Sequence, residues 1–309
     1  MVESTGPRAS SWVRAARHVL LATALVVLVC GLVGGMSLAT YRALDASLAG
    51  LSEVVTGTVT PLGGSVVRAE WTSPDGLAHS ADIPLAVTPP PAEAPATIAY
   101  DPRAPHRAVV PGAEIFADAD RALGGVVFTA LVTVLTAAHV VWLAVSRTLL
   151  LRRSPTRLAV RRLRVQRGLL TRSYLETESG PRRWVPVYFD PALPTLPTPT
   201  VVEAYGDPRR NRFVAFRVNG VTLFPSGRVR ATEPPGRRTD NAAVPDAPES
   251  VPGMARQFRV DAPAALSAPL VGLFWAYIDS SGFPGWLAAT ALTAALAFWV
   301  WAVRGSDPS

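Results

Sequence analysis

Four long stretches without charged residues divide this chain, and they cover residues 19–39, 122–145, 262–278 and 280–303. A helix rises about 1.5 Å per residue and a bilayer core is about 30 Å thick, so about 20 apolar residues suffice to cross it. The third stretch is short and contains Pro269, and the continuous apolar part of the fourth begins at Trp286. The pattern predicts four transmembrane helices at 19–39, 122–145, 262–278 and 286–303.

The last two predicted helices are joined by DSSGFPG at residues 279–285, a turn-forming string that favours a tight hairpin. Aromatic side chains flank both ends of this hairpin, where amphipathic rings prefer the headgroup level of a membrane. At the turn they are Trp275, Tyr277, Phe283 and Trp286, and at the other end Phe298, Trp299 and Trp301.

A different, strand-like pattern occupies residues 40–121. Segments 52–60, 65–71, 77–85 and 96–110 are rich in β-branched or alternating apolar residues, with a strong turn signal at 72–76 and a Pro-rich loop at 88–95. Four or five short strands predict a small β domain, either a compact barrel or a sandwich.

Residues 146–232 predict a second β-rich domain. Strand-like runs cover 182–189 and 200–206, and 212–232 contains turns at Asn219–Gly220 and at 225–227, which predict three antiparallel strands. Residues 158–165 either extend the second span or begin a strand, and 190–200 form a Pro-rich rigid loop. Residues 233–261 are rich in proline and poor in apolar residues, which predicts a disordered linker.

Composition supports a membrane protein. Only 17% of the 309 residues are charged, against about 25% in ordinary globular proteins, and the mean hydropathy is +0.25. The predicted fold class is a multi-pass α-helical membrane protein with about four transmembrane helices and two small, mainly β soluble domains. The formal net charge of +7 would ordinarily indicate a nucleic-acid partner, but the basic segments lack interleaved aromatic residues, so no nucleic acid is expected.

The distribution of charge predicts the orientation. Residues 40–121 hold five Arg against ten Asp or Glu, whereas 146–261 hold 21 Arg against ten, and nine of those Arg lie between Arg147 and Arg172. Basic residues near span ends stay in the cytoplasm. We therefore expect a plasma-membrane protein with 1–18, 146–261 and 304–309 inside, and 40–121 and 279–285 outside. The lipid bilayer is the expected partner, with anionic lipids at the basic segment.

The first span also has some features of a signal peptide, with SLA preceding Thr40. Its 21 apolar residues exceed the usual length of about 7–15 in such segments, which favours an uncleaved anchor. Cleavage before Thr40 is the alternative and would leave three spans. The single cysteine, Cys30, follows Val29 where a lipobox has a small residue, so we interpret it as a buried apolar side chain.

Residues 19–145 resemble a widespread bacterial family of uncharacterised membrane proteins with an extracytoplasmic β domain between two spans. The matching residues are Gly57–Val59 (GTV), Asp75–Gly76, Tyr100–Pro102 with Pro105 (YDPxxP), and Ala108–Val110. The Arg-only usage and the added C-terminal half are of an actinobacterial type. The resemblance implies placement in the envelope and supplies no catalytic residues; YDPRAP itself reads as a turn.

A search for chemistry assigns no catalytic, cofactor-binding or metal-binding residue. The four histidines, His18, His79, His106 and His139, lack metal-ligand spacing, and no nucleotide or hydrolase motif occurs. His139 is the one titratable residue inside a span, and Asp279 lies at a different depth. We therefore expect a non-enzymatic envelope scaffold that binds an unknown membrane or envelope protein. The alternatives are an accessory subunit of a transporter or a small transporter, and an enzyme.

Overall fold

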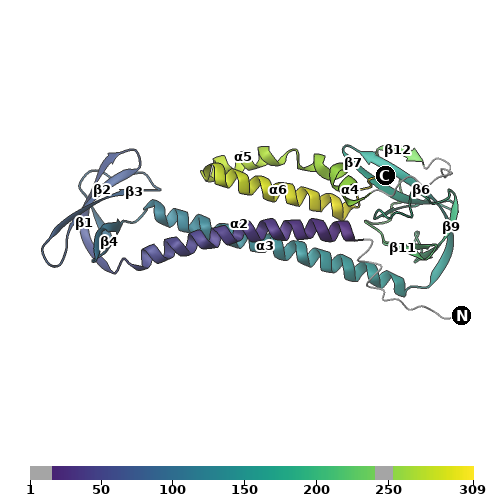
Figure 1. Ribbon diagram of the computed structural model, residues 1–309, viewed down its shortest axis with the longest axis horizontal. Helices are drawn as coiled ribbons and strands as arrows, with labels where there is room; N and C mark the ends of the chain where they lie inside the picture. Colours follow the sequence, from purple (N-terminus) through teal and green to yellow (C-terminus); the bar gives the residue numbers. More distant parts are fainter. Residues whose placement is uncertain (1–15, 241–252) are drawn as a thin grey trace. The chain divides into compact units, whose positions relative to one another are not determined.

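The computed structural model describes residues 16–240 and 253–309, and the chain divides into two compact units. One unit is Cys30–Val132, and the other combines the described residues of Met1–Val29 with those of Thr133–Ser309. Two long helices, α2 (Arg17–Ala49) and α3 (Glu114–Thr148), each contribute to both units (Figure 1).

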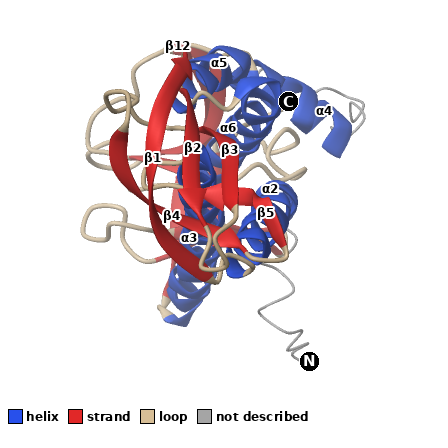
Figure 2. Ribbon diagram, turned by 90° about the vertical axis from the view of Figure 1, so that its left-hand side faces the viewer, coloured by secondary structure: helices blue, strands red, loops and turns tan. Residues whose placement is uncertain are grey.

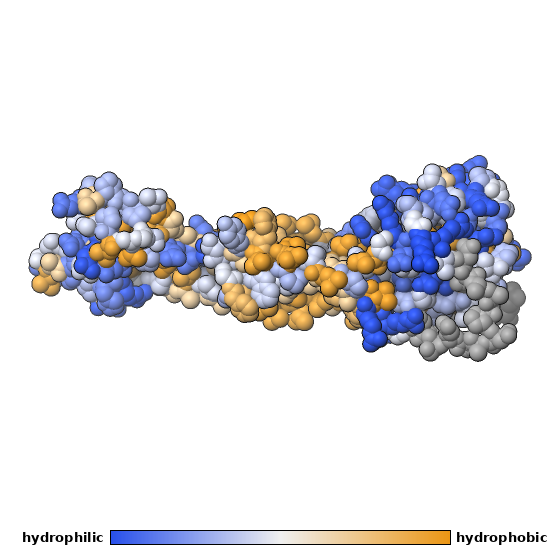
Figure 3. Space-filling view, turned by 90° about the horizontal axis from the view of Figure 1, so that it is seen from above, coloured by the Kyte–Doolittle hydropathy of each residue, from blue (hydrophilic) through white to orange (hydrophobic). Residues whose placement is uncertain are grey.

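Three helices in the described residues are long and apolar enough to cross a membrane. They are α2, α3 with the short η1 (Leu149–Arg152) that continues it, and α6 (Gly282–Arg304). Many of their large apolar side chains are exposed, and Figure 3 shows such side chains gathered over the helices. Leu28, Leu32, Val134, Leu135 and Leu287 are examples. Helices α2 and α3 are longer than the apolar stretches 19–39 and 122–145, because the flanking residues, rich in Ala and Leu, continue the helix.

The third predicted span differs from a straight helix over 262–278. The structure has α4 (Met254–Asp261), a 3₁₀ turn η2 (Ala262–Ala265) and α5 (Ala268–Asp279), with a bend of 44° at the break. Pro269 lies in the first turn of α5, where its missing N–H and its ring interrupt the preceding helix. Neither helix beside the break is long and apolar enough to cross a membrane by itself, but the two together are. The number of candidate spans in the described residues is therefore three, or four if this bent pair is one span.

Helices α5 and α6 form a hairpin and lie side by side (Figure 1). The turn is shorter than the predicted 279–285, because α6 already begins at Gly282. Gly272 lets the two helices approach closely, since a Cβ there would lie 2.2 Å from Thr290 Oγ1 and 2.9 Å from the carbonyl oxygen of Trp286. The indole Nε1 of Trp286 donates to the carbonyl of Pro269 at 3.1 Å and fastens the start of α6 to the start of α5.

The first sheet confirms the predicted strands of 40–121 and is antiparallel throughout, in the order β3-β2-β1-β4-β5 (Figure 2). A bridge between Leu85 and Ala113 joins the ends of β3 and β5, which makes the sheet barrel-like. Its core is built around Val59, Val67, Trp71, Ile83, Ile98 and Tyr100. The strands are β1 (Glu53–Gly63), β2 (Val66–Thr72), β3 (Ala78–Pro84), β4 (Ala94–Asp101) and β5 (Ala104–Val109).

The GTV segment of β1 has a steric explanation. A Cβ on Gly57 would lie 2.3 Å from the carbonyl oxygen of Glu70 and 2.5 Å from Ile98 Cδ1. The backbone oxygen cannot move without breaking the pairing of β1 with β2, so only glycine fits at this position.

The second sheet has seven strands, in the order β11-β10-β9-β6-β7-β8, with β12 paired to β6. Bridges from Trp184 to Arg230 and from Val187 to Pro225 connect β8 with the segment after β11, so this sheet is also barrel-like. The turn predicted at Asn219–Gly220 is confirmed between β10 and β11. The strands are β6 (Pro155–Arg167), β7 (Leu170–Thr177), β8 (Trp184–Val187), β9 (Thr200–Tyr205), β10 (Ala215–Val218), β11 (Val221–Leu223) and β12 (Arg237–Asp240).

Three local predictions for this region differ from the structure. The segment after Pro225 makes isolated bridges and no third strand. Within the predicted linker 233–261, β12 and α4 are ordered elements, while 241–252 lie outside the described residues. Strand β12 forms because β9 pairs only with residues 155–160 of β6, which leaves the backbone of 163–166 open for Arg237–Asp240. Residues 158–165, ambiguous from the pattern, belong to strand β6.

Candidate functional site at the helix ends

One hydrophobic core joins the ends of three helices to the second sheet. The helix ends contribute Ala16, Val19 and Ala22 before and within α2, Val140 and Leu143 of α3, Leu150 of η1 and Ala302 of α6. The second sheet and its loops contribute Tyr188, Tyr205, Ala215 and Phe224. The hydroxyl of Tyr188 donates to the carbonyl of Val303 at 3.1 Å, which ties α6 to the sheet directly. The helix ends and the second sheet therefore fold as one body.

A buried polar cluster lies beside this core and combines His18 of α2, Asp261 and Gln257 of α4, and Ser306 after α6. His18 Nε2 is 3.0 Å from Asp261 Oδ2, and the two side chains are 13% and 0% exposed. Ser306 donates to the same carboxylate oxygen at 3.0 Å, and Gln257 Nε2 donates to Ser306 Oγ at 2.7 Å. The second oxygen of Asp261 is buried without a hydrogen-bond partner in the part of the chain described here.

A second cluster builds the segment after α6 into the sheet. Arg162 of β6 is 2% exposed and pairs with Asp307 at 2.9 Å, while Ser173 of β7 donates to the same carboxylate. The backbone N–H of Asp307 donates to Thr171 at 2.9 Å, and Ser309 donates to Asp307 Oδ1 at 2.6 Å. Burial alone would raise the pKa of Asp307, but the Arg162 charge and the hydrogen bonds from Ser173 and Ser309 outweigh it and hold the pKa below its ordinary value. Asp307 is therefore an ionised, buried counterion of Arg162.

The nine arginines between Arg147 and Arg172 do not share one environment. Arg147 and Arg162 are each 2% exposed and lie inside the protein. The guanidinium of Arg147 lies 3.9 Å from the ring centroid of Phe213 and donates from Nε to Pro225 at 2.9 Å. At least two of these residues thus have packing roles in addition to the topological role that their charge predicts.

His139, the one titratable side chain predicted inside a span, lies between aromatic rings. Its ring centroid is 5.5 Å from those of both Trp142 and Trp299. Cys30 is 2% exposed, in agreement with the prediction of a small buried side chain.

The YDPRAP segment forms the turn between β4 and β5. Asp101 accepts the backbone N–H of Arg103 at 2.9 Å, and its other oxygen lies 3.6 Å from Arg107. Tyr100 is 2% exposed in the core of the first sheet. These contacts give the segment the structural role that its turn pattern predicts.

The first sheet also brings Ser73, Asp75 and His79 together at the β2–β3 turn. Ser73 Oγ lies 3.1 Å from His79 Nε2 and contacts Asp75 Oδ1. In a nucleophile–base–acid triad the carboxylate orients the histidine, whereas here it contacts the serine. The same hydroxyl is 3.0 Å from the carbonyl of Leu77, so the contacts close a turn.

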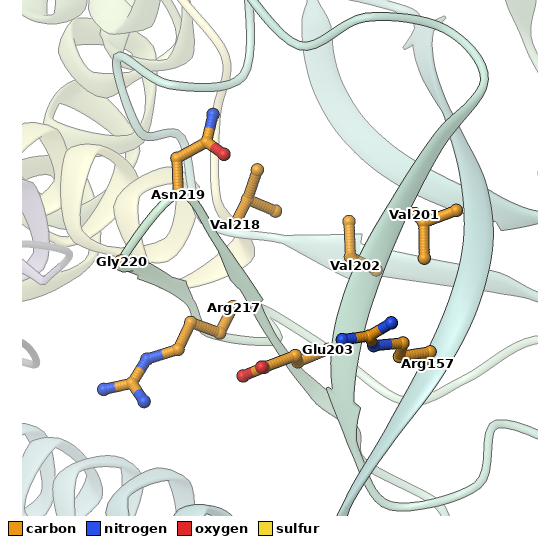
Figure 4. A pocket seen from close by; sticks show the side chains of 8 residues that line it. All are labelled: Arg157, Val201, Val202, Glu203, Arg217, Val218, Asn219 and Gly220. Carbon is orange, nitrogen blue, oxygen red and sulfur yellow. The ribbon is translucent and has the colours of Figure 1, made fainter.

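A shallow surface cavity of about 380 Å³ lies on the outer face of the second sheet (Figure 4). Its floor contains a cross-strand row, with Arg157 of β6 opposite Glu203 of β9 and Glu203 opposite Arg217 of β10. The cavity is open and polar, and one carboxylate lies between two guanidinium groups, so little net charge remains to select a ligand.

Comparison with known proteins yields no match among family models, curated proteins or solved structures. The site is therefore defined by its own residues. The sequence pattern places His18 and Asp261 in the flanking segments 1–18 and 233–261, and it indicates neither these two nor Arg162 and Asp307 as a pair. Their positions were the usable signal: His18 and Asp261 directly precede apolar stretches, and Ser306 lies three residues beyond another, all on the side predicted to be cytoplasmic.

Proposed function

We propose that this chain is an integral protein of a bacterial plasma membrane that serves as a non-enzymatic scaffold for another membrane or envelope protein. The apolar helices α2, α3 and α6 support membrane insertion. The acidic first β domain and the basic second one support an orientation with the termini and the second sheet in the cytoplasm.

In this proposal the bent pair is the fourth span. Helix α5 has 12 residues, about 18 Å of helix, and is too short to cross a core of about 30 Å by itself. Together with η2 it gains most of the required length, and α4, which carries Arg256, Arg259 and Asp261, then lies at the cytoplasmic end of the span. The exposed Leu270, Phe274, Tyr277 and Ile278 on α5 then face lipid or a partner helix.

The scaffold role rests on the shared core of the helix ends and the second sheet. Buried side chains such as Val19, Leu143 and Ala302 pack in the same cluster as Tyr188 and Phe224. A soluble domain fixed in this way cannot rotate freely on a linker and presents its surface in a constant position, which favours binding of a membrane-bound partner.

Affinity purification of the full chain in mild detergent tests the proposal. We expect one or more proteins to co-purify in stoichiometric amounts and to be lost when Tyr188→Ala separates the sheet from α6, while Val201→Ser, an exposed substitution on β9, retains them. Recovery of the chain alone contradicts the scaffold role.

The orientation is tested with single cysteines in a Cys30→Ser background. We expect Ser80→Cys in the first sheet to react with a membrane-impermeant maleimide in intact cells, and Arg228→Cys near the second sheet to react only after permeabilisation. Both positions are exposed on the protein surface, so a difference in labelling reports the side of the membrane and not burial of the thiol. The reverse labelling pattern would refute the orientation.

A second candidate function, a small transporter or an accessory subunit of one, is favoured by the contact of His18 with Asp261. Broken helices recur at ion-binding sites of transporters, and Asp261 lies about one turn before the break that follows η2. In proteoliposomes under an imposed potential we expect proton uptake that Asp261→Asn abolishes and His139→Ala retains. Absence of uptake by the unmodified chain removes this candidate.

A further inference from the structure

Four arginines from separate elements lie around Tyr188 and Arg172, and we call them the arginine cluster. Arg147 lies near the end of α3, Arg172 in β7, Arg230 beyond β11, and Arg304 is the last residue of α6. The turn at 225–227 brings Arg147 and Arg172 together, since its first carbonyl accepts from Arg147 and its Ser226 hydroxyl accepts from Arg172 Nη2 at 3.2 Å.

Backbone pairing brings Arg304 close to Arg172 and attaches the segment of Arg230 to β8. Ser306, two residues beyond Arg304, forms a bridge with Arg172, and Arg230 forms a bridge with Trp184 at the edge of the sheet. The pKa of Arg172 is lowered, first by burial and then by the positive charges of Arg304 and Arg230, against the opposite influence of Tyr174 and Tyr188. The positive charges of Arg304 and Arg230 therefore act on the Arg172 guanidinium.

No carboxylate pairs with any member of the arginine cluster within the described residues. Other arginines of the second sheet do have carboxylate partners: Arg162 pairs with Asp307, and Arg182 and Arg238 pair with Glu176. Three members also have a buried nitrogen without a hydrogen-bond acceptor among the described residues. These atoms are Arg147 Nη1, Arg172 Nε and Arg230 Nε.

Tyr188 does not supply the missing negative charge. Burial raises the pKa of its hydroxyl to about 12, although the charges of Arg147 and Arg172 act in the opposite direction. The phenol is therefore neutral at physiological pH and donates to Val303. The cluster retains its positive charge and its free donors.

We propose that the arginine cluster binds a phosphate-bearing anion, either the headgroup of an anionic phospholipid or free phosphate. Guanidinium groups offer paired N–H donors whose spacing matches phosphate oxygens. Arg147 and Arg304 lie near the ends of helices proposed to span the membrane, a level at which headgroup phosphates lie. The lipid source thus rests on the proposed membrane insertion, whereas binding of phosphate itself does not.

The test uses the full chain purified in a neutral detergent. Native mass spectrometry measures retention of phosphatidylglycerol against phosphatidylcholine, and thermal denaturation measures stabilisation by inorganic phosphate against chloride at equal ionic strength. The variant is Arg172→Gln with Arg230→Gln. The matched control is Arg167→Gln with Arg210→Gln, which removes the same charge from two exposed positions.

We expect the cluster variant to weaken anion binding at least about tenfold and the control to change it less than about twofold, because lost charge-assisted hydrogen bonds reduce affinity strongly. If the double variant fails to fold, Arg304→Gln, an exposed position, replaces it with the same expectation. Retention of phosphatidylglycerol without stabilisation by inorganic phosphate identifies a lipid site. Retention of the lipid together with stabilisation by inorganic phosphate identifies a site for phosphate groups in general.

Equal losses in the variant and its control, or no anion binding at all, overturn the proposal. If the chain stays soluble after removal of detergent yet phosphate stabilises it through these arginines, the membrane proposal fails and the anion site stands.

Discussion

Replacing Asp307 by Asn removes the counterion of Arg162 without changing the size of the side chain. The two groups are 2.9 Å apart and are 0% and 2% exposed, so at an effective dielectric constant of about 20 their attraction is roughly 6 kcal/mol. The cost of desolvating both charges offsets much of this attraction. Loss of one partner from such a pair leaves a buried, uncompensated charge and typically costs about 3–5 kcal/mol.

The surface pair of Glu233 and Arg238 provides the control. Its atoms approach to 2.7 Å, but the side chains are 52% and 32% exposed, and Arg238 also contacts Glu176. We expect Glu233→Gln to cost less than about 1 kcal/mol.

Tryptophan fluorescence during thermal unfolding in detergent measures both variants. A loss of 3–5 kcal/mol lowers the midpoint by about 10 °C in a unit of this size. Adding Arg162→Met to Asp307→Asn should restore part of the loss, because no buried charge then lacks a partner. Equal midpoints for Asp307→Asn and Glu233→Gln would refute the role assigned to the buried pair.

Three further predictions follow from burial and packing. Because the folded pKa of Asp307 is depressed, its stabilisation is complete above the ordinary value of 3.8 and is lost as pH falls through the folded pKa; midpoints of the unmodified chain should therefore fall more steeply with acid in that range than those of Asp307→Asn. Gly57→Ala should destabilise the first sheet by about 1–3 kcal/mol, measured as faster amide hydrogen exchange in β1 and β2. Gly272→Val should lower the thermal midpoint through its clash with the Trp286 carbonyl, whereas Gly35→Ala, with open space around its Cβ, should leave it unchanged.

Features encoded by neighbouring residues were predictable from the sequence. Apolar runs gave the helices α2, α3 and α6, and β-branched runs with turn residues gave the first sheet and the Asn219–Gly220 hairpin. The bend between η2 and α5 was less predictable, because hydropathy counts apolar residues and is insensitive to the break at Pro269. Strand β12 was missed because its stability comes from an open edge of β6, which composition does not show.

The candidate site was missed because it depends on contacts between distant parts of the chain. His18 and Asp261 are separated by most of the sequence, and each by itself is an ordinary polar residue beside an apolar run. The predicted topology already placed both on one side of the membrane. Pairing them required the packing of α2 against α4 and the segment after α6, which no local pattern encodes.

The position of Asp307 also has a consequence for biosynthesis. Arg162 lies 145 residues earlier in the chain, so all strands of the second sheet leave the ribosome long before their counterion does. If the second sheet closed before this segment is in place, it would bury the Arg162 guanidinium without its carboxylate partner. Burial of Arg162 in the second sheet therefore depends on the segment after α6, which supplies the carboxylate that pairs with it.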